Sequence, residues 1–130
     1  MIELQMKKNV FVVDDNNMNL FVVKETLKEH FKITAIPSAE KMFAILEKIL
    51  PDLILLDIFM PDMDGFEAAQ ILKNNSKYAD IPVIFLTSTI DDNTKKRGLD
   101  LGITDILIKP FLKDELIKRI RKYFGDDTDD

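Results

Sequence analysis

Short runs of apolar residues recur along the chain at regular intervals. Five such runs cover residues 9–13, 31–36, 53–56, 81–86 and 105–108, and successive runs begin about 22 to 28 residues apart. Each interval has room for a strand, a helix and two short loops, which is the spacing of repeated β-α units. In the first, third and fourth runs, polar residues do not alternate with apolar ones, which is typical of strands covered on both faces. The runs therefore predict five strands in a parallel sheet.

Between the runs, apolar residues recur at helical spacing and predict helices over residues 16–30, 38–50, 64–73, 91–101 and 113–124. Ser38 is the predicted N-cap of the second helix, and Asp64 with Glu67 matches a capping box at the start of the third. The first helix is apolar on too many sides to predict one buried face. The second and fifth helices each have an apolar stripe that we predict to be core: Met42, Ile45, Leu46 and Ile49, and Leu112, Leu116, Ile120 and Phe124.

Strands and helices that alternate in this way predict right-handed crossovers, with helices on both faces of the sheet. For five strands the common doubly wound order is 2-1-3-4-5, the flavodoxin-like (βα)5 arrangement. Ligands of such sheets bind beyond the carboxyl ends of the strands, near the switch between the first and third strands. The predicted fold class is therefore α/β, and we expect the functional site at this edge of the sheet.

The composition of the 130-residue chain agrees with one globular domain. Hydrophobic residues make up 46% of the chain and charged residues 32%, and no apolar run approaches the roughly 18 residues that a membrane-spanning helix needs. Cysteine is absent, which excludes disulfides, thiolate metal sites and cysteine nucleophiles. The first residues, MIELQMKKNV, lack the apolar core of a signal peptide, so we expect a cytoplasmic protein with no membrane partner.

The net charge of −5, from 23 acidic and 18 basic side chains, argues against nucleic acid as a partner. Residues 125–130, GDDTDD, are predicted to form a disordered acidic tail after a domain of residues 1–124. Three further acids, Asp14, Asp15 and Asp57, follow predicted strands. Outside these two groups the bases slightly outnumber the acids, so we expect the acidity to be local.

Polar side chains follow four of the five predicted strands: Asp14 and Asp15 the first, Asp57 the third, Thr87 the fourth and Lys109 the fifth. In the order 2-1-3-4-5 the first and third strands are neighbours, so the three carboxylates should converge. Carboxylates that lie so close repel one another unless a cation joins them. Oxygen ligands without cysteine or histidine favour Mg²⁺, which is the cofactor that we predict.

A carboxylate, a Mg²⁺ ion, a lysine and a hydroxyl around one position are the parts that phosphoryl transfer requires, because positioning and charge neutralisation supply most of its catalysis. Carboxylates are established nucleophiles in the formation of aspartyl phosphates. Asp57 is the predicted nucleophile, because a lone carboxylate at the end of a central strand can keep one oxygen on the metal and offer the other.

Four motifs occur in an order and spacing that together are highly specific: VVDDN at residues 12–16, LLDIFMPDMDGFE at 55–67, LTS at 86–88 and GITDILIKPF at 102–111. Through them, residues 7–124 resemble the receiver domain of the two-component response regulators. The Asp-Asp-Asn-x-x-Asn start is similar to that of receivers in hybrid histidine kinases. We therefore expect a single-domain receiver or the receiver of a hybrid kinase, and the start at Met1 and the GDDTDD end favour the first.

The resemblance implies a role for each site residue. Asp57 accepts a phosphoryl group from a phosphohistidine. The implied Mg²⁺ ligands are Asp15, Asp57, the backbone carbonyl of Phe59 and, through water, Asp14. The groups implied to bind the phosphoryl oxygens are Thr87 and Lys109, and the bond from Lys109 to Pro110 is expected to be cis.

The resemblance also implies the partners and the limits of the chemistry. The expected phosphoryl donor is a sensor histidine kinase or a phosphotransfer protein, and the signal passes to a protein partner that the sequence does not identify. A homodimer is left open. We expect no enzyme activity beyond autophosphorylation from small phosphodonors and slow autodephosphorylation.

Thr87 and Ile106 occupy the switch positions of the family, and the second departs from its usual pattern. Receivers usually carry Tyr or Phe where this chain has Ile106, and that ring turns inward when the hydroxyl residue shifts toward the phosphoryl group. We therefore predict that phosphorylation perturbs residues 87–101 more than residues 105–108. Phe59 is bulky at a position that affects how water reaches the phosphoryl group, so we also expect a long-lived phosphorylated state.

Three other functions are the alternatives. A flavodoxin-like cofactor-binding protein would need a loop rich in Ser, Thr and Gly after the first strand, whereas this chain has carboxylates there, which repel phosphate. An aspartyl-phosphate phosphohydrolase of the haloacid dehalogenase type would carry an Asp-x-Asp motif on the first strand, and Asp57 lies on the third without a second acid at residue 59. A phosphorylation-independent interaction module would be expected to have lost one of Asp57, Thr87 or Lys109.

Overall fold

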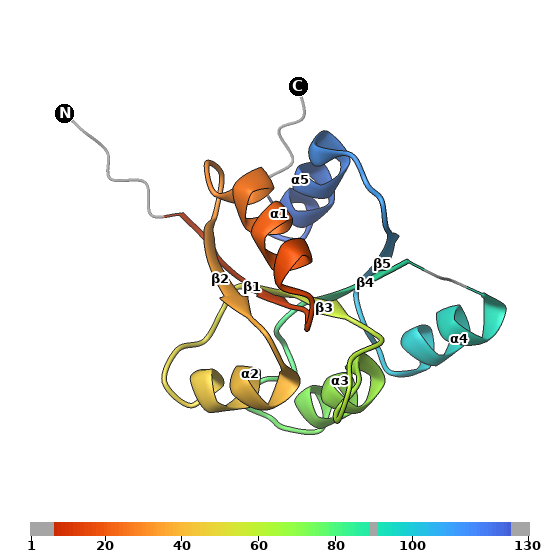
Figure 1. Ribbon diagram of the computed structural model, residues 1–130. Coiled ribbons are helices and arrows are strands. Elements are labelled where there is room, and N and C mark those ends of the chain that lie inside the picture. Colours follow the sequence, from red (N-terminus) through yellow and green to blue (C-terminus); the bar gives the residue numbers. More distant parts are fainter. Residues whose placement is uncertain (1–6, 89–90, 126–130) are drawn as a thin grey trace.

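Strands and helices alternate throughout the described part of the chain (Figure 1). The computed structural model describes residues 7–88 and 91–125, so the predicted acidic tail lies outside the described residues, apart from Gly125. The elements are β1 (Asn9–Val13), α1 (Asn17–Leu27), β2 (Lys32–Ile36), α2 (Ala39–Leu46), β3 (Leu53–Asp57), α3 (Gly65–Lys73), β4 (Val83–Thr87), α4 (Asp92–Asp100), β5 (Asp105–Ile108) and α5 (Lys113–Lys122).

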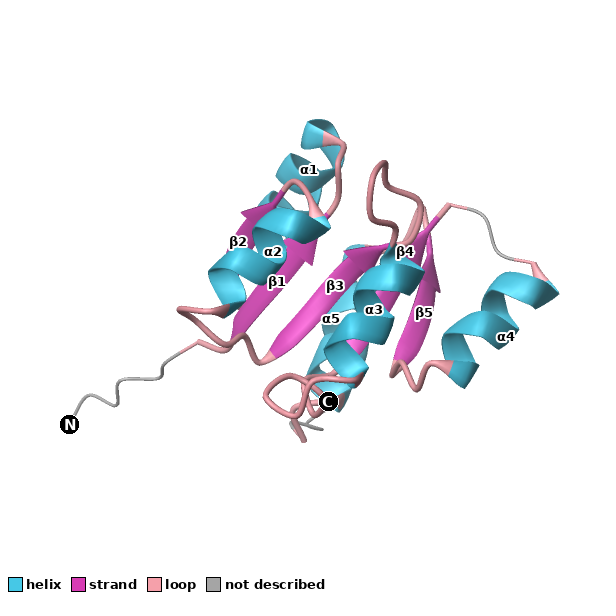
Figure 2. Ribbon diagram, turned by 90° about the horizontal axis from the view of Figure 1, so that it is seen from below, coloured by secondary structure: helices cyan, strands magenta, loops and turns pink. Residues whose placement is uncertain are grey.

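The strands form one parallel sheet in the order β2-β1-β3-β4-β5, which confirms the predicted topology. Helices α1 and α5 cover one face of the sheet, and α2 and α3 cover the other (Figures 1 and 2). Helix α4 lies at the margin of the molecule, beyond α3 and beside β5. Within residues 7–88 and 91–125, no helix has the length and apolar character needed to cross a membrane.

The central strands are buried on both faces, which explains why their sequences do not alternate. All residues of β3 and β4 are buried. Neighbouring residues of β1 point to opposite faces, so Val10 packs in the α1 and α5 layer and Phe11 in the α2 and α3 layer. The edge strands β2 and β5 are only partly buried. Strands β1, β3 and β4 therefore form the platform whose ends carry the site.

The helix starts follow the capping signals of the sequence. Ser38 accepts a hydrogen bond from the backbone N–H of Lys41, and Asp64 and Glu67 form the predicted capping box. Gly65, the first residue of α3, lies so close to β3 that a Cβ atom there would come within 2.6 Å of the Asp57 carbonyl oxygen. Only glycine allows this approach, which fixes the start of α3 against the strand that bears Asp57.

Two residues assigned to apolar core stripes are exposed instead, so that part of the prediction was wrong. Ile49 is 50% exposed because α2 ends at Leu46, before the stripe is complete. Leu112 is 76% exposed because it is the N-cap of α5 and has an extended backbone, so it does not belong to the helical face. The structure also shows which face of α1 is buried, which the sequence pattern did not predict. The buried residues of α1 are Leu20, Val23 and Leu27.

Candidate metal and phosphoryl-acceptor site

The ends of β1, β3, β4 and β5 bring the predicted site residues to one edge of the sheet. Val13 of β1 pairs with Leu56 of β3, so Asp14 and Asp57 follow at neighbouring positions. Thr87 of β4 pairs with Ile108 of β5, so Lys109 follows directly beside Thr87. Strand order thus places residues that are far apart in the sequence side by side.

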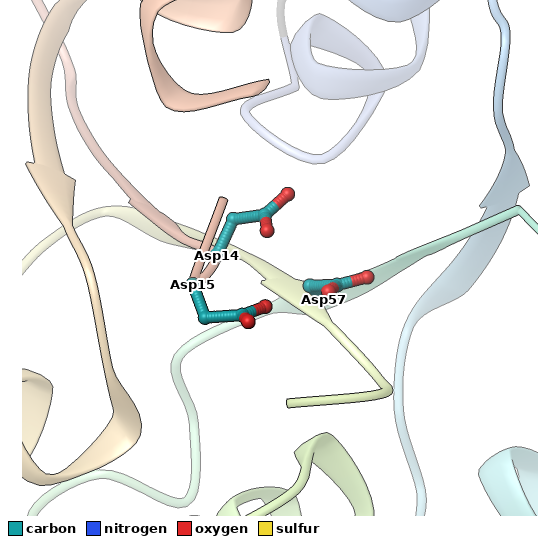
Figure 3. A group of neighbouring side chains, drawn as sticks. All are labelled: Asp14, Asp15 and Asp57. Atoms are coloured by element: carbon teal, nitrogen blue, oxygen red, sulfur yellow. The ribbon is translucent and has the colours of Figure 1, made fainter. Parts of the chain in front are cut away.

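Asp14, Asp15 and Asp57 form one group of carboxylates (Figure 3). One oxygen from each of the three lies within 4.8 Å of the others. Asp14 and Asp57 are buried, and Asp15 is exposed at the rim. The group therefore has a buried base and an open side from which a ligand can enter.

Lys109 reaches this group from the end of β5. Its ammonium lies 3.0 Å from an oxygen of Asp14 and 3.5 Å from an oxygen of Asp57. The backbone N–H of Lys109 donates to the carbonyl oxygen of Thr87 at 2.8 Å, which anchors the residue to β4. The Lys109–Pro110 bond is cis, as the resemblance implied. The lysine is therefore held with its charge between the two buried carboxylates.

Asn16 contributes to the site in a way that the sequence reasoning missed. Its backbone N–H donates to an oxygen of Asp14 at 2.9 Å, and its side-chain oxygen accepts from the backbone N–H of Asn19 at 3.0 Å. The same residue thus orients the carboxylate and caps α1. The preference for Asn at a helix N-cap was the available signal.

Asp57 has an altered acidity in this environment. Burial, and after it the neighbouring Asp14 carboxylate, raise the pKa of Asp57 from 3.8 to about 6, while Lys109 opposes the change. A carboxylate with a raised pKa loses part of its repulsion when a cation binds next to it. Burial and the Asp14 carboxylate thus disfavour the charged form of Asp57, which a cation bound beside it would favour.

The donor set fits Mg²⁺ better than it fits the other common protein metals. Three carboxylates with one ammonium beside them leave two negative charges, which a divalent cation balances. The ligands are all oxygens, which suit Mg²⁺, and the exposed side of the group leaves room for the waters that this ion retains.

The remaining predicted residues lie on β4, on β5 and in the loop after β3. Thr87 is buried at the end of β4, next to the residue that pairs with Asp57. Phe59, two residues after Asp57, has a side chain that is 56% exposed and lies edge-on to Phe66. Ile106 is half-buried at the edge of the α2 and α3 layer, where its Cδ1 atom faces Gly98. The roles proposed for these residues stay predictions.

A family model described as the response regulator receiver domain matches residues 10–121. The curated relatives include hybrid signal transduction histidine kinase D of Dictyostelium discoideum, 36% identical over 88% of this chain and 7% of that protein. They also include the transcriptional regulatory protein CrdR of Helicobacter pylori, 35% identical over 94% of this chain and 57% of that protein. The chain spans between 7% and 57% of the length of such relatives.

Solved structures share the fold. The chemotaxis protein CheY4 of Vibrio cholerae has a TM-score of 0.85 and 28% identity, with 92% of this chain and 99% of that chain covered. The receiver domain of sensor histidine kinase PA1611 from Pseudomonas aeruginosa has a TM-score of 0.84 and 25% identity, with 92% and 98% covered. That structure is described as having a magnesium ion coordinated in the active site cleft.

Proposed function

Because the chain belongs to the response regulator receiver domains, which serve two-component phosphorelay signal transduction, we propose that its Asp57 accepts a phosphoryl group from a phosphohistidine. Receiver domains take such groups from histidine kinases or phosphotransfer proteins and bind Mg²⁺ at an aspartate cluster. The observation that carries the proposal is the group of three carboxylates within 4.8 Å, with the Lys109 ammonium beside two of them.

The residues of this chain divide the work as follows. Asp15, Asp57 and the backbone carbonyl of Phe59 would hold the cation directly, and Asp14 would hold it through water. When bound, Mg²⁺ neutralises the carboxylates and presents positive charge to the phosphoryl oxygens. An oxygen of Asp57 forms a bond to phosphorus while the phosphorus–nitrogen bond of the donor breaks and the ring nitrogen keeps the electron pair.

Lys109 and Thr87 receive the transferred group. The Lys109 ammonium already lies between the two buried carboxylates and needs only a small movement to follow the new charge on Asp57. The Thr87 hydroxyl, at the end of the neighbouring strand, donates to another phosphoryl oxygen. Their positive and polar groups stabilise the charge that is spread over the phosphoryl oxygens during transfer.

A protein donor is supported by the surface beside the pocket. Helix α1 begins directly after the acidic pair and exposes three apolar side chains on its outer face: Met18 (68%), Phe21 (61%) and Val22 (50%). An apolar patch next to the entrance suits a helix of the donor, which has to bring its histidine close to Asp57. We therefore place the donor's docking surface on α1.

We propose that the domain comprises residues 1–124 and that it has no activity on separate substrates beyond accepting and slowly losing its own phosphoryl group. Phosphohistidine donors obtain their phosphoryl groups from ATP, which supports a cytoplasmic location. Phosphorylation of Asp57 changes partner binding through Thr87 and the segment that follows β4.

Incubation with a small acyl phosphate and Mg²⁺ tests the proposal, with intact mass as the readout. Wild type should gain one phosphoryl group, Asp57→Asn should gain none, and a chelator should abolish the gain. The matched control is Asp62→Asn, which removes an exposed acid from the loop after β3 and should behave as wild type. A gain that persists in Asp57→Asn, or no gain in wild type, would refute the assignment.

The docking surface has its own test. With a phosphorylated histidine phosphotransfer protein as donor, Phe21→Ala should slow the transfer by about 10-fold, since it removes a large exposed aromatic contact. The rate with the small acyl phosphate should stay unchanged. Equal slowing with both donors would argue against a docking role for α1.

A further inference from the structure

Helix α4 is weakly attached to the rest of the described molecule. Its sequence, DNTKKRGLD, is polar and contains a glycine in the helix interior, and only Thr94 and Gly98 of its residues are buried. Residues of α4 and β5 line a hollow of about 350 Å³. Side chains therefore do not fill the space between the helix and the strand. Figures 1 and 2 show the helix at the margin of the fold. Its position must therefore depend on few contacts.

One of these contacts joins α4 to α3. The guanidinium carbon of Arg97 lies 3.8 Å from the centre of the Phe66 ring. Phe66 is almost completely buried at the start of α3, whereas Arg97 is exposed on α4. A cation over the face of a ring is attracted by the negative charge of the π system. Because Phe66 is buried, water screens this attraction less than it would at a fully exposed ring.

The same ring also touches the segment that carries Asp57. Phe59 lies edge-on to Phe66, with ring centres 6.5 Å apart, and Phe85 of β4 lies edge-on to it from the core at 5.6 Å. Phe85 is fully buried, so its ring is fixed, whereas Phe59 is 56% exposed and able to move. Phe59 follows Asp57 by two residues, and a change at Asp57 therefore reaches the ring under Arg97 through a single side chain.

We propose that Arg97 and Phe66 form a latch that holds α4, and that Phe59 couples the state of Asp57 to this latch. The coupling rests on the proposed function of Asp57. When the backbone after β3 adjusts to a phosphoryl group, Phe59 shifts against Phe66, the stacking of Arg97 weakens and α4 is released. The two arrangements of α4, held and released, are the two states that such coupling requires. Ile106 has no ring, so among residues 7–88 and 91–125 the ring that contacts α4 is that of Phe66.

Amide hydrogen exchange of residues 92–101 tests the latch without any phosphoryl group. Arg97→Gln should raise exchange by about 2- to 5-fold, the loss expected for one exposed cation–π contact, and Arg97→Lys should keep part of the protection that Arg97→Gln loses. The matched control is Lys96→Gln, which removes the neighbouring exposed charge and should leave exchange unchanged. Phe59→Leu should raise exchange as well, and Phe59→Leu combined with Arg97→Gln should match Arg97→Gln alone.

A phosphorylated sample then tests the coupling. In wild type, phosphorylation should raise α4 exchange, and in Arg97→Gln it should add nothing further. Intact mass measures the phosphoryl gain separately, so a chain that gains none refutes the proposed function, and the unphosphorylated variants still decide the latch. Additive effects of the two substitutions, an unchanged α4 in Arg97→Gln, or the same phosphorylation response in both proteins would overturn the proposal.

Discussion

Strand β3 and helix α4 are attached to the molecule in opposite ways. Every residue of β3 is buried, and the strand has a hydrogen-bonded neighbour on each side. Helix α4 buries only Thr94 and Gly98. Asp57, the proposed phosphoryl acceptor, ends β3, and the proposed output lies in α4. The proposed chemistry, which depends on distances of a few ångströms, thus lies on a fully buried element, and the proposed response lies on an element with few buried residues.

The largest expected effect comes from truncating one leucine in each element. Leu55→Ala in β3 should lower the free energy of unfolding by about 2 to 5 kcal/mol, because the side chain is completely buried. Leu99→Ala in α4 should change it by no more than about 0.5 kcal/mol, because that side chain is 66% exposed. Urea unfolding of both variants measures the difference, and similar losses would show that α4 is as firmly integrated as β3.

A second comparison uses one glycine from each region. Gly65→Ala should cost about 1 to 3 kcal/mol, because its Cβ would meet the Asp57 carbonyl oxygen at 2.6 Å and backbone atoms have little freedom to yield. Gly98→Ala should stay within about 1 kcal/mol of wild type. Its Cβ meets the end of the Ile103 side chain at 2.9 Å, which can turn away, and alanine favours the helix. The same unfolding measurement decides it, and equal costs would contradict the comparison.

The third prediction concerns the charge of the Asp57 carboxylate at the end of β3. The pKa of Asp57 is raised from 3.8 in the unfolded chain to about 6, so without Mg²⁺ its favourable contribution to stability is complete below pH 3.8 and is lost as the pH rises through about 6. Solvent at the pocket rim screens part of the effect, so we expect Asp57→Asn to gain about 1 to 2 kcal/mol over wild type between those limits.

Thermal unfolding of both proteins over this pH range, in a chelating buffer, measures the gain. Saturating Mg²⁺ should reverse the order at neutral pH, since only wild type keeps the full set of carboxylates. A difference that is independent of pH, or a variant that Mg²⁺ stabilises as much as wild type, would argue against the charge account.

The smallest expected effect concerns Phe59, which follows the end of β3 by two residues. Phe59→Asn should speed the loss of the phosphoryl group by about 3- to 10-fold, because the smaller polar side chain lets water approach the acyl phosphate. Phe59→Leu, which keeps an apolar side chain, is the control and should decay at nearly the wild-type rate. Decay of the phosphorylated protein in Mg²⁺ is followed by intact mass. Equal decay in wild type and Phe59→Asn, or faster decay in wild type, would refute the shielding by Phe59.

Local patterns predicted the fold well where a signal and its consequence lie close together in the chain. The unbroken apolar runs identified the buried strands, and Asp64 with Glu67 identified the start of α3. The pattern failed at helix ends: Ile49 and Leu112 continue an apolar repeat although the helix has ended or not yet begun. Where a helix stops depends on what the next segment packs against, and a repeat alone does not contain that information.

The sequence by itself determined which polar residues stand at the ends of the strands: Asp14 and Asp15, Asp57, Thr87 and Lys109. These follow from local order, because a strand and the residue after it are read from the same few positions. Only the tertiary structure decided that Lys109 lies 3.0 Å from Asp14, a residue 95 positions away, and that burial raises the pKa of Asp57. The latch of Arg97 on Phe66 is of the same kind. Distances and desolvation depend on how the sheet and helices pack, and a single stretch of sequence does not define that packing.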